Sequence, residues 1–143
     1  LLVFVALVTL VNLALSPLPQ FGDAPVTLQR ILGWLLAPLA WLSGVPWNES
    51  QVAGSLLGTK TVLNELIAYL DLARATGLSE HSRLIMTYAL CGFANLSSVA
   101  IQVGGIGALV PSRKSDLARL GLKAVACGTM ANFMSACIAG MLL

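Results

Sequence analysis

One acidic side chain stands out as a candidate for binding chemistry, because the chain around it is 57% hydrophobic and only 10% charged. Glu65 ends the polar segment 58–65, GTKTVLNE, which interrupts an apolar stretch. A carboxylate at membrane depth costs about 2.5 to 3.5 kcal/mol on insertion scales, so such groups usually have a function. The alternative is a structural ion pair with Lys60, and the two interpretations are compatible. Glu65 is therefore the first candidate binding residue.

A second polar segment, residues 92–98 with the sequence GFANLSS, lies inside the uncharged run 84–110. Asn95 and Ser98 are three residues apart and share a helix face, where an amide and a hydroxyl would suit sugar-like hydroxyl groups. Hydrogen bonding between helices is an equally common use of such residues. Phe93 would ordinarily face lipid or core, and its closeness to Asn95 and Ser98 makes a ligand contact worth testing.

The remaining chemistry-bearing residues predict neither an enzyme nor a metal site. No Ser/His pair, HExxH helix or pair of catalytic aspartates is present in the sequence. Cys91, Cys127 and Cys137 fall inside apolar runs without CxxC spacing, so neither zinc nor a disulfide is indicated. The net charge of +2 is scattered, which argues against a nucleic-acid partner.

Composition places these residues in a lipid bilayer. The chain has 143 residues and a mean hydropathy of +0.87, and its charged fraction is well below the roughly 25% of soluble domains. The uncharged stretches 84–110 and 124–143 each supply the roughly 20 residues that cross the hydrocarbon, so two spanning helices are expected.

Five segments must position the polar residues. Residues 1–15 predict a truncated transmembrane helix that ends before Pro17, and residues 26–45 predict an interfacial helix because all three tryptophans cluster there or just beyond. Residues 50–75 predict a re-entrant hairpin, two short helical arms around a polar tip, because irregular backbone at membrane depth must be buried or line a water-filled cavity.

The last two predicted segments are a broken transmembrane helix at 82–110, interrupted at 92–98, and a final transmembrane helix at 117–143. The final helix has a stripe of small residues and one Asn at spacing four, which should pack closely on a neighbour: Ala124, Gly128, Asn132, Ala136 and Gly140. The loop 111–123 has four basic residues and one acidic residue, so it should be cytoplasmic and the C-terminus periplasmic or extracellular.

The two polar segments, 58–65 and 92–98, resemble the two signature segments of the concentrative nucleoside transporters, in wording and in order. The resemblance covers essentially the whole chain, as the C-terminal portion of a bacterial nucleoside permease of this family. It implies an all-α integral membrane fold that is half of an inverted-repeat transporter. The implied activity is symport of nucleosides coupled to a cation, either a proton or sodium.

The resemblance also implies roles for individual residues. Glu65 would bind the ribose hydroxyls from the hairpin tip, Asn95 and Ser98 would hold the ribose from the broken helix, and Phe93 would contact the base. The neighbours at the tip would be Asn64 and Thr59.

By the same resemblance, the coupling-cation site lies outside this chain and no other cofactor is needed. The full-length protein is expected to be a homotrimer in the bacterial inner membrane, with the 1–15 helix in its static scaffold and a periplasmic C-terminus. The competing hypothesis is a non-transporting membrane subunit or channel fragment whose polar residues only pack helices. Uptake by the full-length protein with Glu65→Gln would separate the two.

Overall fold

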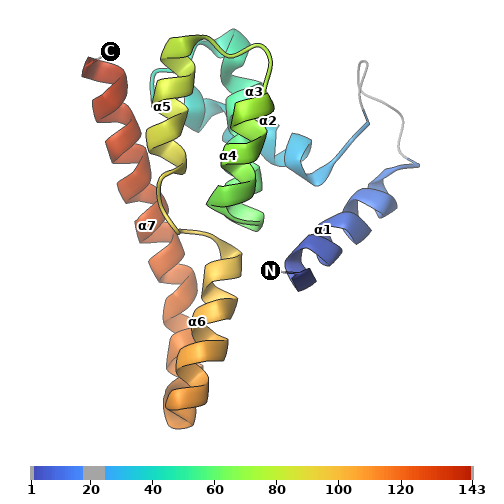
Figure 1. Cartoon of the computed structure of the whole chain (residues 1–143), viewed down its shortest axis with the longest axis vertical. Helices are drawn as coiled ribbons and strands as arrows, with labels where there is room; N and C mark the ends of the chain where they lie inside the picture. The colour runs from blue at the N-terminus through green and yellow to red at the C-terminus, as the bar shows by residue number, and fades with distance from the viewer. Residues whose placement is uncertain (1, 18–24, 143) are drawn as a thin grey trace.

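The computed structural model describes residues 2–17 and 25–142, and within them the backbone forms helices and no strand. The predicted all-α fold is confirmed. Leu1 and Leu143, which the sequence assigned to the first and last helices, lie outside the described residues. The elements in Figure 1 are α1 (Leu2–Leu15), α2 (Leu28–Leu42), α3 (Trp47–Val62), α4 (Glu65–Arg74), α5 (Glu80–Leu90), α6 (Leu96–Leu109), the 3₁₀ turn η1 (Pro111–Arg113) and α7 (Lys114–Leu142).

Helix α7 is the long axis of the molecule. Together with η1 it forms a helix of 32 residues. The most apolar stretch of this helix has a mean hydropathy of 1.5, and only 11% of that stretch is buried. A core helix of a soluble protein would be mostly buried, so this exposure suits contact with lipid. Figure 1 shows α5 beside one half of α7 and α6 beside the other half. By length and composition, α7 is the one described helix that can cross a membrane alone.

The run 84–110 is not one continuous helix. It divides into α5 and α6, separated by residues 91–95, and α6 alone is shorter than a spanning helix. Asn95 has extended backbone and begins α6 by accepting a hydrogen bond from the N–H of Ser98. An Asn in this position starts a new helix rather than continuing the old one.

Helices α2 and α3 are consecutive in sequence and meet at 118°. Gly44 lies between them with φ of +104°, a conformation that other residues rarely adopt. Pro46 then precedes the first turn of α3. Neither helix is long enough to span a membrane alone, but together they are long and apolar enough to form a broken span or a re-entrant loop. The side chains of Trp34, Trp41 and Trp47 are 44%, 51% and 63% exposed near this bend.

The base of the α3–α4 hairpin is tied to α5. The backbone N–H and hydroxyl of Ser79, at the start of α5, donate to Glu49 Oε2 at 3.0 and 3.1 Å. Arg83 donates from Nη1 to the Leu72 carbonyl at 2.9 Å and from Nη2 to the Ala75 carbonyl. These bonds satisfy carbonyls at the C-terminal end of α4. A core shared by α2, α3, α4, α5 and α7 includes Ala53, Leu56, Ala68, Ile85, Met86, Leu90 and Ala136.

The predicted small-residue stripe on α7 packs against the broken helix. A Cβ added at Gly128 would lie 3.0 Å from the Cβ of Ala94, and one added at Gly140 would lie 2.5 Å from the Ser43 carbonyl oxygen and 3.3 Å from the Ile85 side chain. Ala136 is fully buried. Asn132 lies against Gly92, at the level of the interruption between α5 and α6. The stripe therefore packs against α5 and against the interruption that follows it.

Candidate functional site

The hairpin tip is the two-residue break between α3 and α4. Helix α3 continues to Val62, and Leu63 ends it with its N–H donating to the carbonyl of Thr59 at 2.8 Å. Asn64 is extended, and its Oδ1 accepts from the Ile67 N–H at 2.9 Å. This side-chain cap starts α4 and places Glu65 in its first turn, where a helix N-terminus stabilises a carboxylate.

Asn95 builds the second half of the site. Its Oδ1 accepts from the backbone N–H of Ser98 at 2.7 Å and from the Ser98 hydroxyl at 2.9 Å. These bonds leave its amide Nδ2 directed away from α6, and the residue is only 1% exposed. The Asn95 side chain is thus fixed at one end by the helix that it starts.

The two helix starts meet through their side chains. Asn95 Nδ2 donates to Glu65 Oε2 at 3.0 Å, joining residues thirty positions apart in the sequence. A hydrogen bond to an ionised acceptor is stronger than a neutral one and fixes the orientation of both groups. The structure therefore brings the first turn of α4 and the N-cap of α6 together at one point.

Phe93 and Ser98 lie beside this contact on the broken helix. The Phe93 side chain is 75% exposed. Phe93 and Ser98 line a cavity of about 200 Å³ that α7 closes on its other side with Gly121, Ala124 and Gly128. The structure therefore joins Glu65, Asn95 and Ser98 by hydrogen bonds, and it places the exposed Phe93 beside Ser98.

The other two candidates support the tip from within. Asn64 uses its side-chain oxygen as a helix cap, and Thr59 is 3% exposed one turn before the end of α3. No ion pair joins Lys60 to Glu65 in the described part of the chain. The Lys60 ammonium instead donates to the Ala89 carbonyl at 2.9 Å and is 3% exposed.

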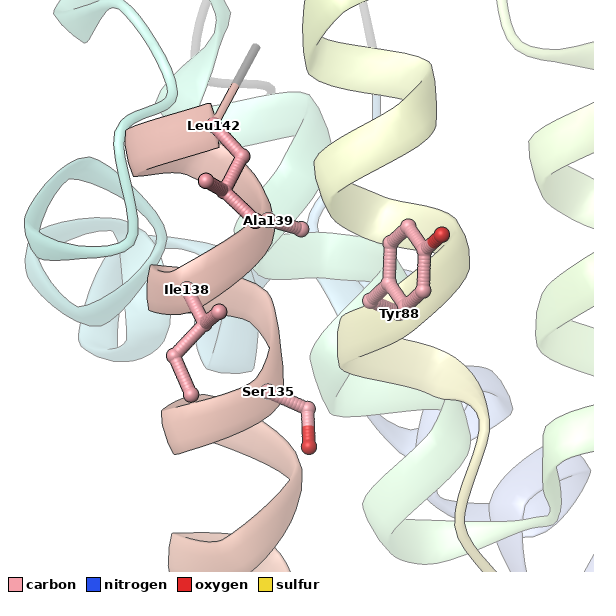
Figure 2. Close-up of a pocket in the computed structure, with 5 residues that line it drawn as sticks. All are labelled: Tyr88, Ser135, Ile138, Ala139 and Leu142. Carbon is pink, nitrogen blue, oxygen red and sulfur yellow. The ribbon is translucent and has the colours of Figure 1, made fainter.

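A separate cavity of about 360 Å³ lies between α5 and α7, away from the polar residues. Figure 2 shows Ser135 and Ala139 directed from α7 toward Tyr88 of α5. Ile138 and Leu142 complete the lining, which is mainly apolar. With one hydroxyl and one phenol, this cavity lacks the convergent polar groups of a specific site for a polar ligand.

Comparison with known proteins identifies the family. Residues 1–140 match the family model described as the C-terminus of Na⁺-dependent nucleoside transporters. The chain belongs to this family. Its members are transporters, not enzymes, and they are integral membrane proteins. The family that the two polar segments indicated is therefore confirmed.

Individual relatives are longer proteins, and the chain matches part of each. It is 52% identical to an uncharacterised transporter, YutK, of Bacillus subtilis (strain 168). It is 47% identical to the nucleoside permease NupC of Helicobacter pylori (strain ATCC 700392 / 26695). Both matches cover 100% of the chain and 36% of the relative. It is 38% identical to the sodium/nucleoside cotransporter 1 of Rattus norvegicus, over 99% of the chain and 24% of that protein. The chain thus spans about a third of the bacterial relatives.

Solved structures agree with this assignment. The structure of CNTnw in an inward-facing, substrate-bound state matches with a TM-score of 0.83 and 47% identity, over 98% of this chain and 34% of that one. The all-helical arrangement described above, with its hairpin and broken helix, is therefore a nucleoside-transporter fold.

Sequence reasoning missed one polar residue near the site of this nucleoside-transporter chain. The Tyr69 hydroxyl donates to the Thr87 carbonyl at 2.7 Å, from α4 to α5. Tyr69 is four residues after Glu65 and so lies on the same face of α4. That spacing was the available signal, but the partner is a backbone carbonyl that no sequence pattern marks.

Proposed function

We propose that the full-length protein is a cation-coupled nucleoside symporter and that this chain supplies the ribose-binding part of its site. The observation that carries the proposal is the hydrogen bond between Asn95 Nδ2 and Glu65 Oε2 at 3.0 Å. It joins a hairpin tip to the start of a half-helix, a common site architecture in inverted-repeat transporters. The nucleoside permease and cotransporter among its relatives support the choice of substrate.

The donors and acceptors at this contact suit the two hydroxyls of a ribose. An ionised carboxylate has about four lone-pair sites, and Asn95 occupies one of those of Glu65. The remaining sites can accept from two adjacent hydroxyls. Ser98 lies one helical turn beyond Asn95 and adds a hydroxyl, and Asn64 and Thr59 hold the tip in shape.

Phe93 completes the proposed site on the side of the base. Its ring is 75% exposed beside Ser98. Stacking of a base on an aromatic ring is worth about 1 to 3 kcal/mol and tolerates any base. Contacts of this kind, together with ribose contacts, would serve purine and pyrimidine nucleosides alike.

The rest of the proposal concerns the whole protein. Sodium or a proton would drive transport from a site outside this chain, and the protein would be a homotrimer in a bacterial inner membrane. Its C-terminus would be periplasmic, because the basic residues around η1 lie at the end of α7 opposite Leu142 and positive loops stay in the cytoplasm.

The test is uptake competition in the full-length protein with uridine, adenosine and their deoxy analogues. Glu65→Gln keeps the shape and removes the charge. Because charge-assisted bonds are worth about 1.5 to 3 kcal/mol each, the affinity for both ribonucleosides should fall at least about tenfold. The variant should also discriminate less than the wild type against deoxy analogues, and free bases should remain poor substrates. Glu80→Gln, an exposed acid at the start of α5, is the matched control.

Two results would count against the proposal. If Glu65→Gln leaves uridine uptake intact, the polar residues only pack helices, as in a non-transporting subunit or channel fragment. If it impairs uptake of only purine or only pyrimidine nucleosides, Glu65 does not bind the sugar.

A further inference from the structure

The C-terminal turn of α5 is held by side chains from the hairpin. Because α5 ends at Leu90, the carbonyls of its last turn lack the partners that a continuing helix would supply. The Tyr88 carbonyl accepts from the Cys91 N–H at 3.2 Å. The Thr87 carbonyl accepts from the Tyr69 hydroxyl at 2.7 Å, and the Ala89 carbonyl accepts from the Lys60 ammonium at 2.9 Å. One donor comes from each arm of the hairpin.

The position of Lys60 is unusual for an ammonium group. It is 3% exposed, and its Nζ donates to a carbonyl. A buried charge is tolerated only with a well-placed partner. The end of α5 is such a partner, because the unpaired carbonyls of a helix C-terminus carry a partial negative charge. The Lys60 side chain therefore crosses from α3 to meet a complementary helix end.

Four polar side chains, those of Lys60, Glu65, Tyr69 and Asn95, connect the hairpin to both ends of the break between α5 and α6. On one side of residues 91–95, Lys60 and Tyr69 bind the end of α5. At the last residue of this segment, Glu65 binds Asn95, the N-cap of α6. Lys60 lies one turn before the tip and Tyr69 one turn after Glu65, so the tip is anchored on both arms.

We propose that Lys60 and Tyr69 are positioning residues, which dock the hairpin onto the end of α5 and thereby set the distance between Glu65 and Asn95. The effect on substrate rests on the proposed nucleoside site, whereas the docking itself does not. Neither side chain needs to touch the ligand. Without them, the end of α5 frays and the hairpin tip loses its fixed relation to α6.

The experiment uses the purified full-length protein with Lys60→Met or Tyr69→Phe. Each change removes a donor and keeps most of the side-chain volume. The controls are Lys123→Met, an exposed lysine of α7, and Tyr88→Phe, an exposed tyrosine of α5. Hydrogen–deuterium exchange of the peptide covering residues 84–95 reports the end of α5, and a peptide from α7 serves as the internal reference.

Loss of a single hydrogen bond should speed exchange in the 84–95 peptide by about fivefold in Tyr69→Phe, and by more in Lys60→Met, where a charge-assisted bond is lost. The controls should match the wild type. Uridine uptake by the same variants should show a KM raised several-fold, because Glu65 and Asn95 are no longer held in register.

The two readouts separate the docking from the substrate site. Unchanged exchange in both variants overturns the proposal whatever happens to uptake. Faster exchange with an unchanged KM supports the docking but overturns its effect on the Glu65–Asn95 distance. If the wild type carries no nucleoside, the proposed function fails, and the exchange measurement still decides the docking. If Lys60→Met does not fold, Tyr69→Phe alone gives the answer.

Discussion

Replacing Asn95 by Asp tests the site most sharply, because the two side chains have the same shape. The Oδ1 contacts to Ser98, at 2.7 and 2.9 Å, can be kept by a carboxylate, which is as good an N-cap as an amide. The group that changes is Nδ2, which donates to Glu65 Oε2 at 3.0 Å. In Asn95→Asp an oxygen takes its place and faces a second carboxylate.

The expected loss of substrate affinity follows from the distance between the side chains of residues 95 and 65. Two unit charges 3.0 Å apart repel by about 5 kcal/mol at an effective dielectric constant of about 20. The charge-assisted hydrogen bond that disappears is worth about 1.5 to 3 kcal/mol. Even the smaller of these values corresponds to about a tenfold loss of affinity. We therefore expect the KM for uridine to rise at least about tenfold in Asn95→Asp.

Two further variants at the same position separate binding from helix capping. Asn95→Ser keeps a capping oxygen and introduces no charge, so its KM should rise less than that of the Asp variant. Asn95→Ala also removes the cap, which should lower the stability of the protein by about 0.5 to 2 kcal/mol. Uptake kinetics in proteoliposomes and the Tm of purified protein measure the two effects independently.

One combination of results would exclude a role of Asn95 in binding. If Asn95→Asp transports uridine with the KM of the wild type while Asn95→Ala is destabilised, Asn95 acts only as a helix cap. The contact with Glu65 would then have no part in binding.

Three other predictions concern the support of the site and its orientation. Gly92→Ala should place a methyl group against the Asn132 amide and cost about 1 to 3 kcal/mol of stability. The double variant with Asn132→Ala should recover most of the lost Tm. No recovery would show that the added methyl group and the Asn132 side chain do not compete for the same space. Arg83→Met should lower the Tm, because the end of α4 loses its donors, with little change in the KM for uridine; a large KM change with an unchanged Tm would contradict this. A cysteine at Ser115 should react with an impermeant maleimide only from the cytoplasmic side, and labelling from the periplasm alone would reverse the proposed topology.

The interruptions of the helices could be predicted because local residues cause them. Asn64 and Asn95 each begin a helix with an extended backbone and a side-chain bond to the N–H three residues later. This use of Asn is visible in sequence, since its side chain competes for backbone hydrogen bonds. The break expected at 92–98 rested on it, whereas the hairpin tip was expected from a polar segment between two apolar arms.

The length of the polar tip could not be predicted in the same way. The sequence placed the whole polar segment 58–65 at the tip, yet α3 continues through Gly58 to Val62. Gly58 is buried, and a Cβ added there would lie 2.6 Å from the Cβ of Leu32 on α2. This glycine permits close helix packing rather than a break, and only the tertiary arrangement distinguishes the two uses.

The partner of Lys60 could not be predicted from the sequence for a related reason. An acid five residues away, Glu65, was the obvious candidate for an ion pair, but the two lie on different helices and no ion pair joins them within the described residues. The carbonyl that Lys60 meets belongs to Ala89, twenty-nine residues later. A backbone acceptor becomes available because α5 ends there, so the pairing depends on where another helix stops.

The charge balance at the site limits the kind of ligand that it suits. Two helix N-termini, those of α4 and α6, meet beside the Glu65 carboxylate. Helix starts alone would attract an anion such as a phosphate. Here the carboxylate already occupies that field, and a phosphate within a few ångströms of it would be repelled. A neutral ligand rich in hydroxyl groups can instead donate to Glu65 without adding negative charge. The geometry behind the proposed nucleoside site therefore disfavours a nucleotide.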